Sequence, residues 1–384
     1  MHSGLFRSLF QRMNKLRVAL FFSLLSFAPA NAQLQQDAAT QQLVLQSLDK
    51  IYNQEFAQAQ PILSRIRARY AQHPVLPLLQ AVQLYWQYLP LATNKSAADQ
   101  YTAALNQCVD LSEKLLRTGQ YDAEANFFLL AAHSYLAMQQ SDKGEFMGAV
   151  GEARRTYGYM KKGFKLTEKN PEFYFPTGLY NYYRDQYPND HGVVKPFMFF
   201  FADGNKQLGL KQMETGFRRG NFTRTEAGYY LVHVLIKHEN QPGKALLFST
   251  ELYNKFPQNL FFASRHAEAL VLSGRYAEAE PITERLMGAP GNVYPVVGTM
   301  LAGLIQEKFR KNDKAATTLY QKALKLPDGK KFTQDYFGMA WTGLGRIAHR
   351  SGDQTKAREH YRQALKIAEY HSTVDEAKRY LKEN

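Results

Sequence analysis

The sequence predicts an all-α fold, built as a solenoid of stacked antiparallel helix pairs. Apolar residues recur three and four positions apart over most of the chain, whereas the alternation typical of strands is hard to find. One segment occurs in two related copies. Residues 54–66 read QEFAQAQPILSRI, and residues 274–286, which lie 220 positions later, read GRYAEAEPITERL. Five of the thirteen positions are identical. Such repetition is typical of a helical repeat array, because one short unit cannot bury its apolar face alone.

The first 32 residues have the layout of a secretory signal. An apolar run over 18–27 follows a basic segment and precedes the small residues Ala30-Asn31-Ala32. We expect cleavage after Ala32 and an exported protein, either periplasmic or secreted. The apolar run is too short for a resident membrane helix, and no later stretch approaches ~20 apolar residues. The basic residues of the segment are Arg7, Arg12, Lys15 and Arg17.

Residues 33–180 are predicted to form N-terminal helical repeats that are partly degenerate. A first apolar stripe runs from Leu43 to Tyr52, and a second runs from Phe127 to Met138. Short breakers separate the stripes, as at Gln72-His73-Pro74 and Thr118-Gly119-Gln120. The helices expected between the breakers are longer than those of a regular helical repeat unit, and they cover residues 76–88, 97–116, 123–139 and 143–166.

Residues 181–224 interrupt the pattern and are predicted to form an irregular, loop-rich insertion. Pro188, Gly192, Pro196 and Gly204 lie close together there, around the apolar run 197–201. A helix is expected from Lys206 to Phe217, and a basic cluster of arginines at 218, 219 and 224 ends the segment. The phenylalanines could plug a hydrophobic gap between repeats, or they could contact a ligand or a membrane.

Residues 225–384 are predicted to form regular repeats. In the last of them the first helix carries Trp341, Leu344 and Gly345, and the second carries Ala357, Tyr361 and Ala364 after a turn at Gly352. This unit resembles the tetratricopeptide repeat family. It departs from the family pattern at Ala348 and Glu369. Anchor alanines at 245, 279, 316 and 357 are spaced by 34, 37 and 41 residues, around the family period. The resemblance implies a right-handed α-solenoid whose concave groove binds a protein or peptide.

The charge of the chain favours acidic partners. The formal charge is +14, and removing four cations with the signal leaves +10. Anionic lipid headgroups, acidic glycans and acidic peptide tails would all be attracted, although a diffuse basic surface can also serve solubility alone. Nucleic acid is disfavoured because the chain carries an export signal.

No catalytic signature is present, so the sequence predicts a protein that is not an enzyme and has no cofactor. Phosphate-binding, nucleophile-elbow and zinc-protease motifs are all missing. His233 and His238 are five residues apart and do not share a helical face, which argues against a metal site made by that pair. The lone Cys108 permits no internal disulfide and is interpreted as a small buried hydrophobe.

We therefore expect an exported scaffold or adaptor that binds a protein or peptide partner, acidic by charge complementarity, in its concave groove. The alternative is an envelope protein that binds glycan or lipid through the 181–224 insertion and the basic surface. Family resemblance implies that first helices line the groove, although exposed basic residues are also the default on any soluble helix. The groove residues on this interpretation are Tyr230, Lys237, His238, Lys308, Thr342, Arg346, His349 and Arg350. Partner identity, binding face and oligomeric state stay open.

Overall fold

The computed structural model describes residue 34 and residues 37–143, 145–190, 195, 198–199, 201–327, 329 and 332–384. The expected signal over residues 1–32 lies outside them. Contacts group residues 1–42 into one unit and residues 43–384 into another. In the first unit, the described residues form the start of a helix in which the Asp37 carboxylate accepts a hydrogen bond from the Thr40 backbone N–H at 3.0 Å.

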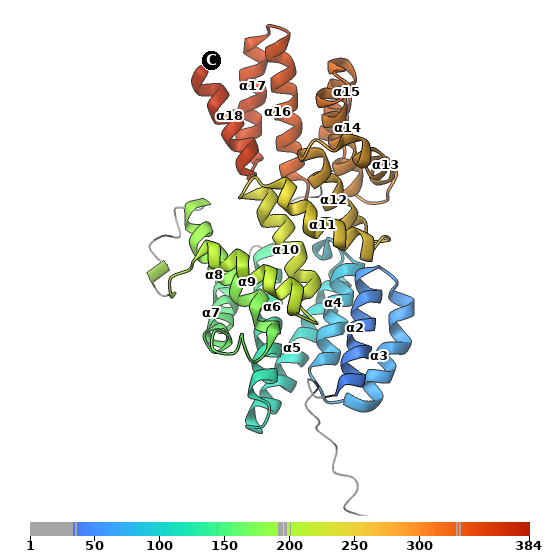
Figure 1. Ribbon diagram of the computed structural model, residues 1–384, viewed down its shortest axis with the longest axis vertical. Helices are drawn as coiled ribbons and strands as arrows, with labels where there is room; N and C mark the ends of the chain where they lie inside the picture. Colours follow the sequence, from blue (N-terminus) through green and yellow to red (C-terminus); the bar gives the residue numbers. More distant parts are fainter. Residues whose placement is uncertain are drawn as a thin grey trace, which may run out of the picture. The chain divides into compact units, whose positions relative to one another are not determined.

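Seventeen α-helices and no strand are found among the described residues (Figure 1). The first half comprises α2 (Ala38–Tyr52), α3 (Phe56–Tyr70), α4 (Val75–Gln87), α5 (Lys95–Arg117), α6 (Asp122–Asp142), α7 (Phe146–Gly163), α8 (Tyr174–Asp190) and α9 (Lys206–Arg219), with short 3-10 turns at Leu91–Thr93 and Pro171–Phe173. The second half comprises α10 (Arg224–Lys237), α11 (Pro242–Lys255), α12 (Leu260–Leu272), α13 (Tyr276–Met287), α14 (Tyr294–Lys308), α15 (Asp313–Lys325), α16 (Gln334–Arg350), α17 (Gln354–Ile367) and α18 (His371–Glu383).

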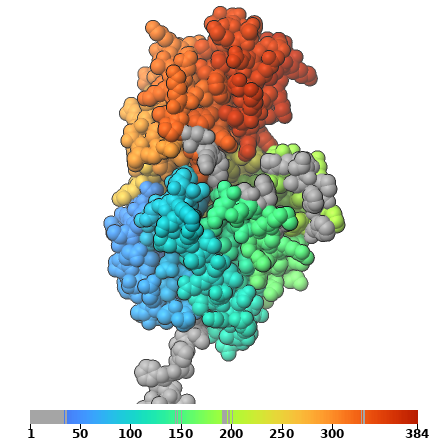
Figure 2. All heavy atoms as spheres, turned by 180° about the vertical axis from the view of Figure 1, so that it is seen from behind, coloured from blue at the N-terminus to red at the C-terminus, as the bar shows by residue number. Residues whose placement is uncertain are grey.

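The expected solenoid of stacked helix pairs is confirmed. Each helix from α3 to α18 packs against the next one along the chain, and further contacts join even-numbered helices such as α12 with α14 and α14 with α16. In the space-filling view, the residues of α4 to α7, coloured cyan to green, lie side by side on one face, as expected for helices that pack in sequence (Figure 2). From α8 to α18, successive even-numbered helices therefore contact one another, which is the arrangement that repeated helix pairs produce.

Packing in the last repeats explains the residues that resemble the tetratricopeptide signature. A Cβ atom at Gly345 would lie 2.9 Å from the Tyr361 ring, and one at Gly343 would lie 2.4 Å from the Tyr320 ring. Small residues on α16 thus admit the large aromatic rings of α15 and α17. The turn before α17 is closed by Gly352, whose φ of 83° favours glycine.

The duplicated segments occupy matching places in two helices. Pro61 and Pro281 are each the sixth residue of their helices, α3 and α13. Both prolines therefore lie inside their helices, beyond the first turn, which is the part of a helix in which proline is best tolerated. Each therefore removes an intrahelical hydrogen bond that would otherwise reach the carbonyl four residues back.

Much of the predicted irregular insertion over 181–224 is helical. It contains the second half of α8 and all of α9, and the expected helix from Lys206 extends to Arg219. Gly178 on α8 and Gly209 on α9 let the two backbones touch, because a Cβ atom at either position would come within 2.7 Å of a backbone atom of the other helix. The pair α8–α9 therefore packs like the other helix pairs.

Candidate functional site

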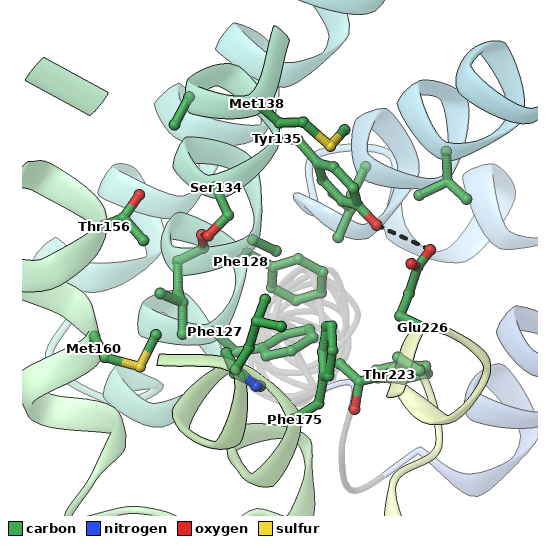
Figure 3. A pocket seen from close by; sticks show the side chains of 18 of the residues that line it. Phe127, Phe128, Ser134, Tyr135, Met138, Thr156, Met160, Phe175, Thr223 and Glu226 are labelled. Atoms are coloured by element: carbon green, nitrogen blue, oxygen red, sulfur yellow. Dashed lines mark hydrogen bonds between the residues drawn. The ribbon is translucent and has the colours of Figure 1, made fainter. Parts of the chain in front are cut away.

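A cavity of about 470 Å³, partly open to solvent, is lined by described residues between Val44 and Tyr230. Its walls come from the even-numbered helices α2, α4, α6, α8 and α10, together with α7 (Figure 3). An apolar cavity of ~150 Å³ accommodates a benzene ring. This one can therefore hold a larger chain-like or multi-ring molecule.

Most of the wall is apolar because the inward faces of these helices carry aliphatic and aromatic residues. Phe127 and Phe128 on α6 and Phe175 on α8 lie close together (Figure 3). Phe201 adds a further ring, 5.0 Å from that of Tyr157. The other apolar or aromatic wall residues include Val44, Leu48, Val75, Leu79, Val82, Leu130, Met138, Met160, Leu179 and Tyr183.

Glu226, in the first turn of α10, brings a carboxyl group into this apolar wall. The hydroxyls of Tyr52 on α2 and Tyr135 on α6 both donate to its Oε1 atom, at 3.1 and 3.3 Å. Figure 3 shows the bond from Tyr135. None of the hydrogen bonds between described residues reaches the Oε2 atom of Glu226.

Burial raises the pKa of Glu226, and the two tyrosine hydrogen bonds lower it only in part. No basic side chain in the described part of the chain forms an ion pair with this carboxyl group. Burial, followed by the charge of Glu226, likewise holds the pKa of Tyr52 and Tyr135 well above 10, so both phenols remain donors. The carboxyl group therefore lacks the positive partner that a buried carboxylate needs.

Thr156 on α7 supplies a second polar atom, and it lies on the opposite side of the cavity from Glu226 (Figure 3). Its Oγ1 atom is buried and has no hydrogen-bond partner among the described residues. Ser134 differs, because its hydroxyl donates to the Leu130 carbonyl at 2.7 Å. A bound molecule could therefore find polar contacts on two sides of an otherwise apolar space.

Of the eight predicted groove residues, only Tyr230 lines the cavity. Lys237 forms an ion pair with Glu369, and His238 lies against Asp190. The structure does not bring these three together with the five predicted residues of the C-terminal repeats.

Those five residues contact side chains or carbonyl groups of the chain itself. Arg346 and Arg350 both reach Glu307, at 2.7 and 3.1 Å, and Lys308 lies 3.7 Å from the same carboxylate. The His349 Nδ1 atom lies 3.2 Å from the Gln354 Oε1 atom. Thr342 is buried and donates to a carbonyl of its own helix. Their role in binding a partner stays a prediction.

Sequence reasoning missed Glu226 and Thr156. Helical spacing places the aromatic residues around them at interior positions, and it does not distinguish a filled core from the wall of a cavity. The available signal was a carboxylate, Glu226, three residues before the apolar stretch of α10 that begins with Tyr229. That pattern is also common at the starts of ordinary helices.

One group of described side chains outside the cavity has the donor atoms of a metal site. It comprises Asp190, His238 and His371.

Comparisons with known proteins reveal no close relative. No protein-family profile matches the chain, and no curated protein sequence matches it. Among solved structures, yeast Tom70 is similar with a TM-score of 0.37 and 15% identity over 81% of this chain and 64% of that one. Human IFIT1, solved as a dimer with PPP-AAAA, is similar with a TM-score of 0.40 and 14% identity over 82% and 69% of the two chains. This chain thus spans less than two thirds of the Tom70 chain.

Proposed function

We propose that this protein is a helical-repeat binding protein whose cavity holds an amphiphilic amine, meaning an apolar body that carries one cationic group. The proposal rests on one observation, the partly exposed Glu226 carboxyl group that faces an apolar cavity without a positive partner among the described residues. Ligand sites typically have this composition, with a volume of ~300–1,000 Å³ and a few polar groups that set orientation.

An ammonium group suits this site for two physical reasons. It would compensate the cost of keeping the Glu226 carboxylate away from water, because a buried charge is tolerated when it is paired. The rings of Tyr52, Tyr135 and Tyr230 also lie around Glu226, and aromatic faces attract cations. The apolar body would lie against Phe127 and its neighbours.

Calorimetric titration with a long-chain alkylamine tests the proposal, alongside the alcohol and the carboxylate of the same chain length. We expect the amine to bind most tightly and Glu226→Gln to reduce that preference by about tenfold or more, which is the effect of losing one charged contact. Ala131→Trp, which fills the cavity, should abolish binding of all three compounds.

Ala68→Trp on the exposed face of α3 is the matched control and should bind like the original protein. Equal affinity for the three compounds would refute the cationic specificity. Undiminished binding by the folded Ala131→Trp variant would show that the cavity is not the site.

We also propose that the protein is exported and acts by binding without catalysing a reaction. The support for export is the tripartite pattern of residues 1–32. N-terminal sequencing of the protein recovered from the cell envelope should begin at Gln33, and a retained Met1 or Met13 would contradict export through this signal. A protein or peptide partner on the C-terminal repeats is tested by pull-down with Arg346→Ala/Arg350→Ala.

A further inference from the structure

Three side chains that are distant in sequence meet outside the cavity. Asp190 ends α8, His238 follows α10, and His371 begins α18. The Asp190 Oδ2 atom lies 3.3 Å from Nδ1 of His238, and Oδ1 lies 2.9 Å from Nε2 of His371. The three ligand atoms all lie within 4.8 Å of one another.

The His238 side chain points an unsatisfied atom into this group. It is only 5% exposed, and its Nδ1 atom has no hydrogen-bond partner among the described residues. The approach to Asp190 is therefore close in distance but lacks hydrogen-bond geometry. A buried polar atom left in this way is costly unless something else binds it.

Neighbouring side chains hold the Asp190 carboxylate in place and pair with the two nearby lysines, Lys206 and Lys237. Gln186 donates to Oδ1 of Asp190 at 2.9 Å, and it accepts from Lys206 at 2.7 Å. Lys206 also pairs with Glu239, and Lys237 pairs with Glu369. Neither lysine is left as an unpaired positive charge beside the three side chains, and Gln186 plays the part of a supporting group around a metal ligand.

We propose that Asp190, His238 and His371 bind a divalent transition-metal ion, for which Zn²⁺ is the best match. Two imidazoles and one carboxylate are preferred zinc ligands at ~2.0–2.2 Å, and a tetrahedral ion at that distance holds its ligand atoms about 3.3 Å apart. The observed spacing needs shifts of only fractions of an ångström to about 1.5 Å. A fourth position would be open to water or to a ligand from solution.

The ion would join parts of the fold that the chain itself separates widely. His371 and Asp190 are 181 residues apart. Among the described helices, α18 packs mainly on α16 and α17 of the C-terminal repeats. A metal would therefore link the last helix to α8 and α10.

Calorimetry with Zn²⁺ on the full chain, freed of any histidine tag and stripped with a chelator, tests the site. We expect one equivalent to bind with a dissociation constant in the micromolar range or below. Each of Asp190→Asn, His238→Ala and His371→Ala should weaken binding by more than about tenfold. Co²⁺ should give the visible absorption of a tetrahedral site in the unmodified protein.

Two variants serve as matched controls: His360→Ala, whose ring stacks on Trp341, and Asp203→Asn at a fully exposed carboxylate. Both should bind Zn²⁺ normally. If a ligand variant fails to fold, X-ray absorption of the zinc-loaded original protein still counts its imidazole ligands, and two are expected. Failure of the original protein to bind one Zn²⁺, or full binding by folded ligand variants, would overturn the proposal.

Discussion

Glu307, which is buried, and Glu226, which is partly exposed to the cavity, show how partners decide the state of a carboxyl group. Glu307 is held by Arg346 at 2.7 and 2.8 Å and by the Tyr320 hydroxyl at 2.7 Å. Burial acts to raise its pKa, but these partners outweigh burial and lower it to about 2. Glu226 has only two phenols, so burial prevails and its pKa rises. The first carboxylate is paired with cations within the fold, whereas the second has only phenol donors among the described residues.

Glu226→Gln should increase the free energy of unfolding at neutral pH. A carboxyl group whose pKa is raised by folding favours the folded state below its unfolded pKa and loses that advantage as pH rises toward its folded pKa. The increase in the free energy of unfolding of Glu226→Gln should therefore appear above about pH 4.5 and vanish below it. Urea unfolding across pH measures this, with the exposed Glu214→Gln as control. A loss of stability at neutral pH would contradict the assignment.

Arg346→Ala should lower the free energy of unfolding by roughly 3–5 kcal/mol, because it leaves Glu307 buried without its main partner. In the original protein the Glu307 contribution is present above pH 4.5 and is lost as pH falls toward about 2. In Arg346→Ala, the free energy of unfolding should therefore fall less steeply between pH 4.5 and about 2 than in the original protein. Urea unfolding compares it with Arg362→Ala at an exposed position of α17, and equal stabilities would refute the prediction.

At the scale of elements, glycines set how closely helices approach. The spacing of α8 and α9 is possible because Gly178 and Gly209 lack side chains. Gly158 on α7 differs, since a Cβ atom there would meet nothing within 4 Å. The same residue type thus has a packing role at two positions and only a conformational cost at the third.

Gly178→Ala should destabilise the fold by about 1–3 kcal/mol, because the added Cβ meets backbone atoms of α9, at 2.7 Å from the Met213 nitrogen. Gly158→Ala is the matched control and should stabilise α7 by up to ~1 kcal/mol. Thermal unfolding of both variants measures the difference. Similar shifts for the two substitutions would mean that α8 and α9 do not pack as described.

At the scale of the whole unit over 43–384, Asn259 joins helices that are far apart in sequence. Its side chain accepts from the backbone N–H groups of Phe261 and Phe262 at the start of α12. It also donates to the Tyr52 carbonyl of α2 at 2.6 Å across 207 residues. The Tyr52 ring packs 5.6 Å from Phe256. These contacts place the Tyr52 hydroxyl where Glu226 can accept from it.

Asn259→Ala should lower the free energy of unfolding by about 2–4 kcal/mol, since it removes a helix cap and leaves a buried carbonyl without its donor. It should also weaken ligand binding, although residue 259 does not line the cavity. Asn312→Ala removes a cap on α15 without a comparable distant bond, so we expect a cost of only ~1 kcal/mol and normal binding. Equal effects of the two variants in unfolding and titration experiments would contradict this role.

The sequence by itself determined the helical repeat architecture. Its apolar spacing, the turn at Gly352 and the signature around Tyr361 all follow from local rules, since each helix buries a face that can be read from its own residues. Three of the four long helices expected in the N-terminal half are found, α5, α6 and α7 with 23, 21 and 18 residues, whereas α4 has only 13.

Only the tertiary structure decided which polar side chains meet at the cavity and at the proposed metal site. Glu226 meets Tyr52 over 174 residues and Tyr135 over 91, and Asp190 meets His371 over 181. No local pattern encodes such meetings, because small rotations between successive helix pairs accumulate along the solenoid. Arg346 is a further case, because only the tertiary structure shows that its guanidinium pairs with Glu307 and Glu376, and its predicted role in binding a partner stays a prediction.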